Sequence, residues 1–210
     1  VAIAPNGRNA YVLNKGNAKI YNFGVTTKAL TTTVGAATTN VGGQPFHMAV
    51  VPSGMGVYVT DNQGGVVYGY SVVGGQNQGQ AAALTTVPYY VTGSGAPNAT
   101  LGTAGSGPRG IAFHPNSSYA YVVNGNDNTI SQFSITGNGL SALGAMGTGG
   151  VTNNTLPVRS NPYYAAVDPS GRYLYVTNKG DNTISQFKIC QVGDTVCTAA
   201  SGVGSLTAMT

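Results

Sequence analysis

The segment "YVVNGNDNTISQF" at residues 121–133 recurs almost unchanged 54 positions later, as "YVTNKGDNTISQF" at residues 175–187. Two more divergent copies precede it, "YVLNKGNAKIYNF" at residues 11–23 and "YVTDNQGGVVYGY" at residues 58–70. A proline stands six positions before the first tyrosine of every copy, and the copies are spaced by 47, 63 and 54 residues. A fixed motif with variable connections indicates a repeat array, and periods near fifty are typical of propeller blades.

Each repeat predicts four β-strands. Short apolar runs that end in proline, such as "MAVVP" and "IAFHP", predict the first strand. The Tyr-Val segment is the second strand, and "TISQF", rich in β-branched and aromatic residues, is the third. A weaker fourth strand is indicated by "KALTTTV", "AAALTTV", "GLSALGA" and "GSLTAM". Helical periodicity is absent, so the sequence predicts an all-β chain.

The predicted strands are apolar on both faces, which indicates sheets packed between other sheets. A β-propeller of about four antiparallel blades provides that environment, whereas an open β-solenoid, the alternative, has shorter repeats. We therefore expect one β-propeller domain over residues 1–210, with units at about 1–43, 44–106, 107–160 and 161–210. We also expect the chain to be processed, truncated or one period of a longer array, with a closed four-bladed ring as the second choice.

The segments "PSGRYLYVTN" and "DNTISQF" resemble the YVTN family of β-propeller repeats, which is close to the lactonase-like seven-bladed propellers. The resemblance covers all four units. It implies a propeller fold, but it does not select a function, because the family includes surface-layer and binding proteins as well as lactonases.

The composition bears on location and partners. Charged residues make up 7% of the chain, against roughly 25% in ordinary globular domains, and glutamate is absent. Such Thr-, Asn- and Gly-rich sequences predict an extracellular or cell-surface protein. The net charge of +4 comes from scattered basic residues, which argues against nucleic-acid binding. No apolar run reaches the ~18 residues of a membrane-spanning helix, so membrane insertion is not expected.

The two cysteines, Cys190 and Cys197, flank the hexapeptide "QVGDTV". If this segment folds back as a hairpin, their side chains face each other, and we predict a disulfide, which would also indicate an oxidising compartment. Free buried thiols are the alternative. A zinc site needs four ligands, which this pair does not supply.

Asparagine or aspartate ends the second predicted strand of every unit. The loops "NGNDNT" and "NKGDNT" superficially resemble calcium-binding loops, but one carboxylate per loop is too few for a strong site. Asparagine and aspartate also stabilise turns by accepting hydrogen bonds from nearby backbone amides. We therefore expect no metal and no cofactor, and we interpret four residues as turn caps: Asn14, Asp61, Asn124 and Asn178.

The resemblance to lactonases implies histidine and arginine around the central opening, with an acidic partner. The weak catalytic candidates are His47, Arg109 and His114. Gly125 stands where a carboxylate would help, and a chain without glutamate offers poor general acid–base pairing. His114 also occupies a position before proline that the other units fill with unrelated residues, namely Ala4, Val51 and Asp168.

These observations favour a non-catalytic extracellular scaffold or binding protein that associates with copies of itself or with further blades. Tyr89 and Tyr90 belong to a segment interpreted as a loop at residues 87–95. If exposed, they favour a protein or glycan partner, and a place inside a blade interface is the equal alternative. Two alternatives remain open: a lactonase that uses His47, Arg109 and His114 to hydrolyse a sugar or muconate-type lactone, and a carbohydrate-binding propeller.

Overall fold

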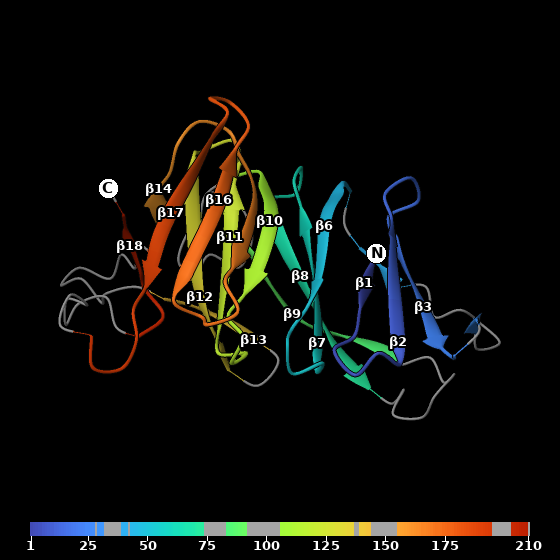
Figure 1. The fold of residues 1–210 in the computed structure, drawn as a ribbon. Helices are drawn as coiled ribbons and strands as arrows, with labels where there is room; N and C mark the ends of the chain where they lie inside the picture. Colours follow the sequence, from blue (N-terminus) through green and yellow to red (C-terminus); the bar gives the residue numbers. More distant parts are fainter. Residues whose placement is uncertain are drawn as a thin grey trace.

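A computed structural model describes residues 1–27, 29–31, 39–41, 43–73, 83–91, 106–136, 139–143, 155–194 and 203–209. These residues form four antiparallel sheets that follow one another in chain order across Figure 1. The predicted all-β propeller fold of four-stranded blades is confirmed. Within the described ranges, no helix is long and apolar enough to cross a membrane.

Each sheet places its strands side by side in sequence order, from an inner first strand to an outer fourth strand. Sheet A contains β1 (Ala2–Ile3), β2 (Asn9–Asn14), β3 (Lys19–Val25) and β4 (Leu30–Thr31), and β5 (Thr39–Asn40) also pairs with β3. Sheet B contains β6 (Pro45–Val50), β7 (Gly56–Asp61), β8 (Val66–Val73) and β9 (Ala83–Val91). Sheet C contains β10 (Pro108–Phe113), β11 (Tyr119–Asn124), β12 (Thr129–Thr136) and β13 (Gly139–Ala142), and β14 (Thr155–Pro157) also pairs with β12. Sheet D contains β15 (Pro162–Val167), β16 (Tyr173–Asn178), β17 (Thr183–Ile189) and β18 (Leu206–Ala208).

The turn between the first and second strands requires a left-handed residue. Gly7, Gly54 and Gly171 occupy this place with φ values of 67°, 75° and 73°. Glycine adopts positive φ without a steric penalty, which explains its position two residues after each proline. In sheet C, Ser117 takes the same conformation, with φ of 63°.

The residues that end the second strands form two kinds of hydrogen bond. The Oδ1 atom of Asn14 accepts the N–H of Gly16 at 2.9 Å, within its own turn. Asp61 accepts three backbone N–H groups through Oδ1, from Gln44, Gln63 and Gly64. Asn124 and Asn178 instead donate through Nδ2 to hydroxyl groups on the following strand, Thr129 and Ser131 in sheet C and Thr183 and Ser185 in sheet D.

The hydrophobic core lies between the sheets. Tyr58 of sheet B packs against Ile111 and Val122 of sheet C, and Tyr121 of sheet C packs against Leu174 and Phe187 of sheet D. A third cluster joins sheets A and B through Tyr11, Ile20, Val57 and Val59. Strand β7 is buried along its whole length, which explains why the second strands are apolar on both faces.

Strand β9 corrects one expectation from the sequence. Residues 87–91, interpreted as part of a loop, belong to this strand, and residues 92–95 lie outside the described part of the chain. Pro88 falls where the register between β8 and β9 shifts. A proline is compatible with a strand at such a bulge because no ladder hydrogen bond needs its missing N–H.

Cys190 is buried and disulfide-bonded. It directly follows β17, and its backbone N–H donates to the carbonyl oxygen of Ser205, next to β18. Cys197 lies outside the described residues, so its pairing with Cys190 stays a prediction.

We expect Asn124→Ala to lower the free energy of unfolding by about 1–2 kcal/mol, because it removes two side-chain hydrogen bonds from a buried site. Chemical denaturation measures this loss. Asn14→Ala is the matched control, since Asn14 is exposed and its loss should cost less than about 0.5 kcal/mol. Equal losses for the two variants would contradict the distinction between the two kinds of cap.

Candidate functional site

The inner strands of sheets B, C and D begin in the same irregular way. Each starts with a proline, and the register with its neighbour shifts within the next few residues. Such a bulge redirects the side chains at the strand end and is frequent next to active sites. Here it affects residues that we call the axial cluster, because they come from the inner strands of three blades: Phe46, His47, Arg109, Tyr163 and Tyr164.

Arg109 lies between two aromatic rings supplied by the neighbouring blades. Its guanidinium carbon is 6.0 Å from the centre of the Phe46 ring and 5.6 Å from that of Tyr163. The two rings also meet edge to face, with centroids 5.1 Å apart. All three residues directly follow the proline of their strand, so equivalent positions of three repeats converge at one place.

Two lysines extend the positive charge of this region. The Nζ atom of Lys15 is 4.6 Å from the Phe46 ring centre, and that of Lys179 is 5.3 Å from the Tyr163 ring centre. Both occupy the hairpin that follows a second strand, and Figure 1 shows the β2–β3 and β16–β17 hairpins at the same edge of the molecule. The ion pairs found among the described residues, Arg159–Asp181 and Lys188–Asp194, include none of the three cations.

Neutral groups hold the Arg109 guanidinium in place. Its Nη1 donates to Oδ1 of Asn161 and to the carbonyl oxygen of Pro162, the latter at 3.4 Å. A Cβ atom on Gly125 would lie 2.3 Å from the Arg109 guanidinium carbon. Gly125, which stands where a carboxylate would help a lactonase, therefore leaves room for the Arg109 side chain.

His47 contacts the ring of Tyr164 across sheet C. The ring centroids are 5.0 Å apart at 84°, and the Nδ1 atom of His47 accepts the backbone N–H of Ile111 at 3.3 Å. Gly110 lets strand β10 lie close to the backbone of β15, because a Cβ atom there would lie 2.9 Å from the Cα atom of Tyr164. With Nδ1 acting as acceptor, the proton of the neutral ring is on Nε2.

Burial is the main cause that lowers the pKa of His47 from 6.5 to about 4, and the positive charges of the N-terminus and Lys15 lower it further. The imidazole is therefore neutral at pH 7. A neutral Nε2–H group and the charged Arg109 are hydrogen-bond donors suited to an oxygen atom that gains negative charge.

Acidic groups are engaged elsewhere. Asp61 pairs in register with Pro45, but its Oδ1 atom is bound by three backbone amides. Within the described ranges, no group of three or more His, Cys, Asp or Glu residues could hold a metal ion. The cluster can thus bind and polarise an anionic or carbonyl oxygen through positively charged side chains and hydrogen-bond donors.

The structure does not bring His114 to the axial cluster. It follows β10, whereas Arg109 lies at the beginning of that strand. Its Nε2 atom is 2.9 Å from the carbonyl oxygen of Gly171, and its Nδ1 atom accepts the N–H of Asn116 at 3.2 Å. His114 is buried and links the turns of sheets C and D, so the three sequence candidates do not form one constellation.

Sequence reasoning found His47 and Arg109 but missed most of the cluster. Phe46 and Tyr163 share the repeat position of Arg109, directly after proline, and Tyr164 shares the position of His47. The two lysines share the position after the strand-end asparagine. Comparing the repeats position by position would have identified these shared positions as candidates, because equivalent residues of a propeller face the same axis.

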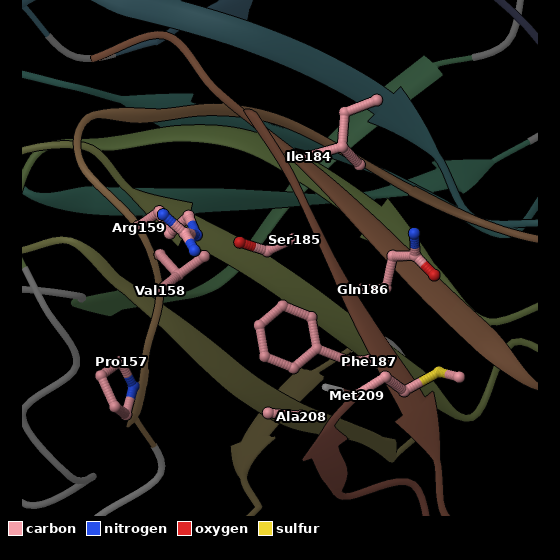
Figure 2. Close-up of a pocket in the computed structure, with 9 residues that line it drawn as sticks. All are labelled: Pro157, Val158, Arg159, Ile184, Ser185, Gln186, Phe187, Ala208 and Met209. Atoms are coloured by element: carbon pink, nitrogen blue, oxygen red, sulfur yellow. The ribbon is translucent and has the colours of Figure 1, made fainter. Parts of the chain in front are cut away.

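A separate pocket of about 480 Å³ lies beside β17 (Figure 2). Arg159 is its charged residue, and it pairs with Asp181 at 3.7 Å. The remaining lining is apolar or uncharged: Pro157, Val158, Ile184, Ser185, Gln186, Phe187, Ala208 and Met209. This pocket has no nucleophile–base pair and is not the candidate catalytic site.

We expect the His47 ring to titrate near pH 4 in the folded protein, which NMR of its C2 proton measures directly. Because the folded-state pKa lies below the ordinary value of 6.5, His47 favours folding above pH 6.5, and this contribution is lost as the pH falls from 6.5 towards 4. His47→Gln should reduce the slope of stability against pH in this window. A midpoint near 6.5 would contradict the buried, neutral assignment.

Two curated relatives match part of this chain at 33% identity. A 6-phosphogluconolactonase of Serratia proteamaculans (strain 568) is 33% identical over 97 residues, which are 44% of this chain and 28% of that protein. A 6-phosphogluconolactonase of Yersinia pestis (strain Pestoides F) is 33% identical over 98 residues, 43% of this chain and 27% of that protein. The matched region thus spans less than a third of the length of these relatives.

Solved structures resemble nearly the whole chain. A putative 6-phosphogluconolactonase from Bacteroides fragilis superposes with a TM-score of 0.72 at 20% identity, covering 99% of this chain and 52% of that one. The periplasmic gluconolactonase of Pseudomonas aeruginosa gives a TM-score of 0.67 at 18% identity, covering 98% and 51%. At these identities the likeness establishes the fold.

The relatives overturn the expectation of a non-catalytic, secreted structural protein that self-assembles. That expectation depended on the absence of glutamate and on a low-charge composition, yet the matched curated proteins are lactonases. The absence of one residue type excludes a particular acid–base pair, not the chemistry that arginine and histidine can perform.

A family model described as "Lactonase, 7-bladed beta-propeller" matches residues 86–201, which is more than half of the chain. The match includes all of sheet C and the strands of sheet D up to β17, so it covers Arg109, Tyr163 and Tyr164 of the axial cluster. The chain belongs to the lactonase family of seven-bladed β-propellers.

Proposed function

We propose that the protein hydrolyses a lactone of an anionic sugar acid at the axial cluster. Water adds to the ester carbonyl, the ring C–O bond breaks, and the ring oxygen takes up a proton to yield an open-chain hydroxy acid. The observation that carries the proposal is that Arg109, held by neutral partners, and neutral His47 lie on the adjacent inner strands β10 and β6. The matched relatives of the chain are 6-phosphogluconolactonases.

The charge of the site favours an anionic substrate. Lys15, Arg109 and Lys179 surround two aromatic rings and take part in neither described ion pair. A phosphate or carboxylate group is attracted to such a cluster, and the attraction is strengthened where protein excludes water. The faces of Phe46 and Tyr163 supply apolar surface against which the carbon skeleton of a sugar packs.

Stabilisation of the oxyanion is the chemical role that fits these residues. Addition of water places negative charge on the former carbonyl oxygen, and Arg109 together with the Nε2–H of His47 would donate hydrogen bonds to it. His47 does not serve as the base through Nδ1, because that atom already accepts the N–H of Ile111.

The repeat type of the four units and the cellular compartment are also inferred. We assign the four units to YVTN-type repeats within one propeller domain, because the repeated Tyr-Val strand carries the interface tyrosines Tyr58 and Tyr121. The disulfide at Cys190 supports an oxidising compartment, in which such bonds persist.

We expect the purified protein to hydrolyse 6-phosphogluconolactone, measured by proton release in weakly buffered solution. Arg109→Gln should lower kcat/KM by about 100-fold, because it removes a donor to the developing oxyanion. Lys15→Gln together with Lys179→Gln should raise KM for the phosphorylated lactone more than for unphosphorylated gluconolactone.

Arg172→Gln is the matched control, because Arg172 is exposed in a turn away from the axial cluster and its loss should leave kcat/KM unchanged. An intact, folded protein without activity on either lactone would overturn the proposal. Equal losses of kcat/KM for Arg109→Gln and Arg172→Gln would contradict the assignment of the reaction to the axial cluster.

A further inference from the structure

The third position of the Tyr-Val motif differs between the repeats. It is Leu13 in sheet A, Thr60 in sheet B, Val123 in sheet C and Thr177 in sheet D. Leu13 and Val123 lie within regular second strands, so the repeat does not need a hydroxyl group at this position in order to form its sheet. The contacts of the Thr60 hydroxyl group give it a different role.

The Thr60 hydroxyl group lies between the inner strands of sheets B and C. Thr60 is fully buried, and its Oγ1 atom accepts the backbone N–H of His47 at 3.1 Å. The same atom lies 2.5 Å from the carbonyl oxygen of Arg109 and 3.4 Å from that of His47. A hydroxyl group has one proton, and the shorter separation assigns it to Arg109. One oxygen atom therefore bonds to the backbone of both candidate oxyanion donors.

A second hydrogen bond joins the same two strands. The backbone N–H of Ile111 donates to Nδ1 of His47 at 3.3 Å. Arg109 and Ile111 flank Gly110, so the two bonds to sheet B hold β10 on both sides of this glycine. At Gly110 itself, β10 lies close to the backbone of β15. The position of β10 relative to His47 is thus set by two hydrogen bonds on one side and by close packing on the other.

Thr177 forms the corresponding bonds within its own sheet. Its Oγ1 atom accepts the backbone N–H of Tyr164 at 3.2 Å and lies 3.5 Å from the carbonyl oxygen of the same residue. Among the residues that the structure describes, Thr177 has no hydrogen bond to another sheet. The bond between sheets therefore distinguishes Thr60 from Thr177, and it occurs at the junction that carries His47 and Arg109.

We propose that Thr60 is a positioning residue that fixes Arg109 relative to His47 through its hydrogen bond from sheet B to sheet C. The inference rests on the proposed function, in which these two side chains stabilise the oxyanion. Backbone groups occupy the Thr60 hydroxyl group, so it acts on the placement of the two donors and not on the substrate. Donors stabilise a developing charge only when they are already in place, so a small displacement of either one lowers kcat.

Amide exchange tests the link between the strands without any assay of activity. Thr60→Val removes the hydroxyl group and introduces the residue that the chain itself carries at Val123. We expect the backbone amide of Ile111 to exchange with deuterium at least about 10-fold faster in this variant, because β10 loses one of its two bonds to sheet B and separates from His47 more often. Thr177→Val is the matched control, and it should leave the exchange of Ile111 at the wild-type rate.

Kinetics test the consequence for the proposed reaction. Thr60→Val should lower kcat for 6-phosphogluconolactone by about 30-fold and change KM by less than about 3-fold, because the lysines and aromatic rings that bind the substrate remain. Thr60→Ser keeps the hydroxyl group and should retain at least about half of the wild-type kcat. In an Arg109→Gln background, Thr60→Val should cost less than about 3-fold more, because the positioned donor is already absent.

Three results would each overturn the inference: wild-type exchange of Ile111 in Thr60→Val, equally fast exchange in Thr177→Val, and additive losses of kcat for Thr60→Val and Arg109→Gln. Thr60→Ala, which also lacks the hydroxyl group, takes the place of Thr60→Val if that variant does not fold. Faster exchange of Ile111 in Thr60→Val alone, in a protein that hydrolyses no lactone, would overturn the proposed function and still support the link between His47 and Arg109.

Discussion

The sheets of this protein have apolar faces, and the structure depends on covering those faces wherever two sheets meet. A tyrosine at the centre of the second strand anchors each contact, as Tyr58 does between sheets B and C and Tyr121 does between sheets C and D. Burying such faces removes apolar area from water, which is the dominant favourable term in folding. Stacking sheets face to face along the chain satisfies this requirement and directs the first strand of each sheet towards a common axis.

The axial cluster follows from that arrangement. Strand β10 lies between β6 and β15, so its Arg109 is placed between Phe46 and Tyr163 without any contribution from sequence proximity. Glycine at position 110 lets strand β10 lie close to the backbone of β15, and glycine at position 125 leaves space for the guanidinium. The absence of side chains at two positions is thus as important for the site as the presence of the arginine.

The electrostatics of the cluster are those of a binding and polarising site. Burial keeps His47 neutral, which preserves its Nε2–H as a donor and leaves Arg109 and the two lysines as the charged groups. The other histidine, His114, has a structural role instead. His114 bridges two turns through Gly171 and Asn116, and its contribution is to the packing of sheets C and D.

The sequence by itself determined the fold class, because strands, turns and blade repeats depend on local signals. Prolines, left-handed glycines and apolar strands at a period near fifty residues identify four-stranded units without knowledge of their neighbours. Pro88 shows the limit of such signals, since it lies within β9 at a register shift that depends on the pairing with β8. Only the tertiary structure decided the composition of the site. Its residues lie in different blades and meet because the inner strands converge, so Phe46, Arg109 and Tyr163 come together although more than fifty residues separate each from the next. The tertiary structure also separated His114 from Arg109, because an extended strand carries the chain about 3.3 Å per residue away from its start.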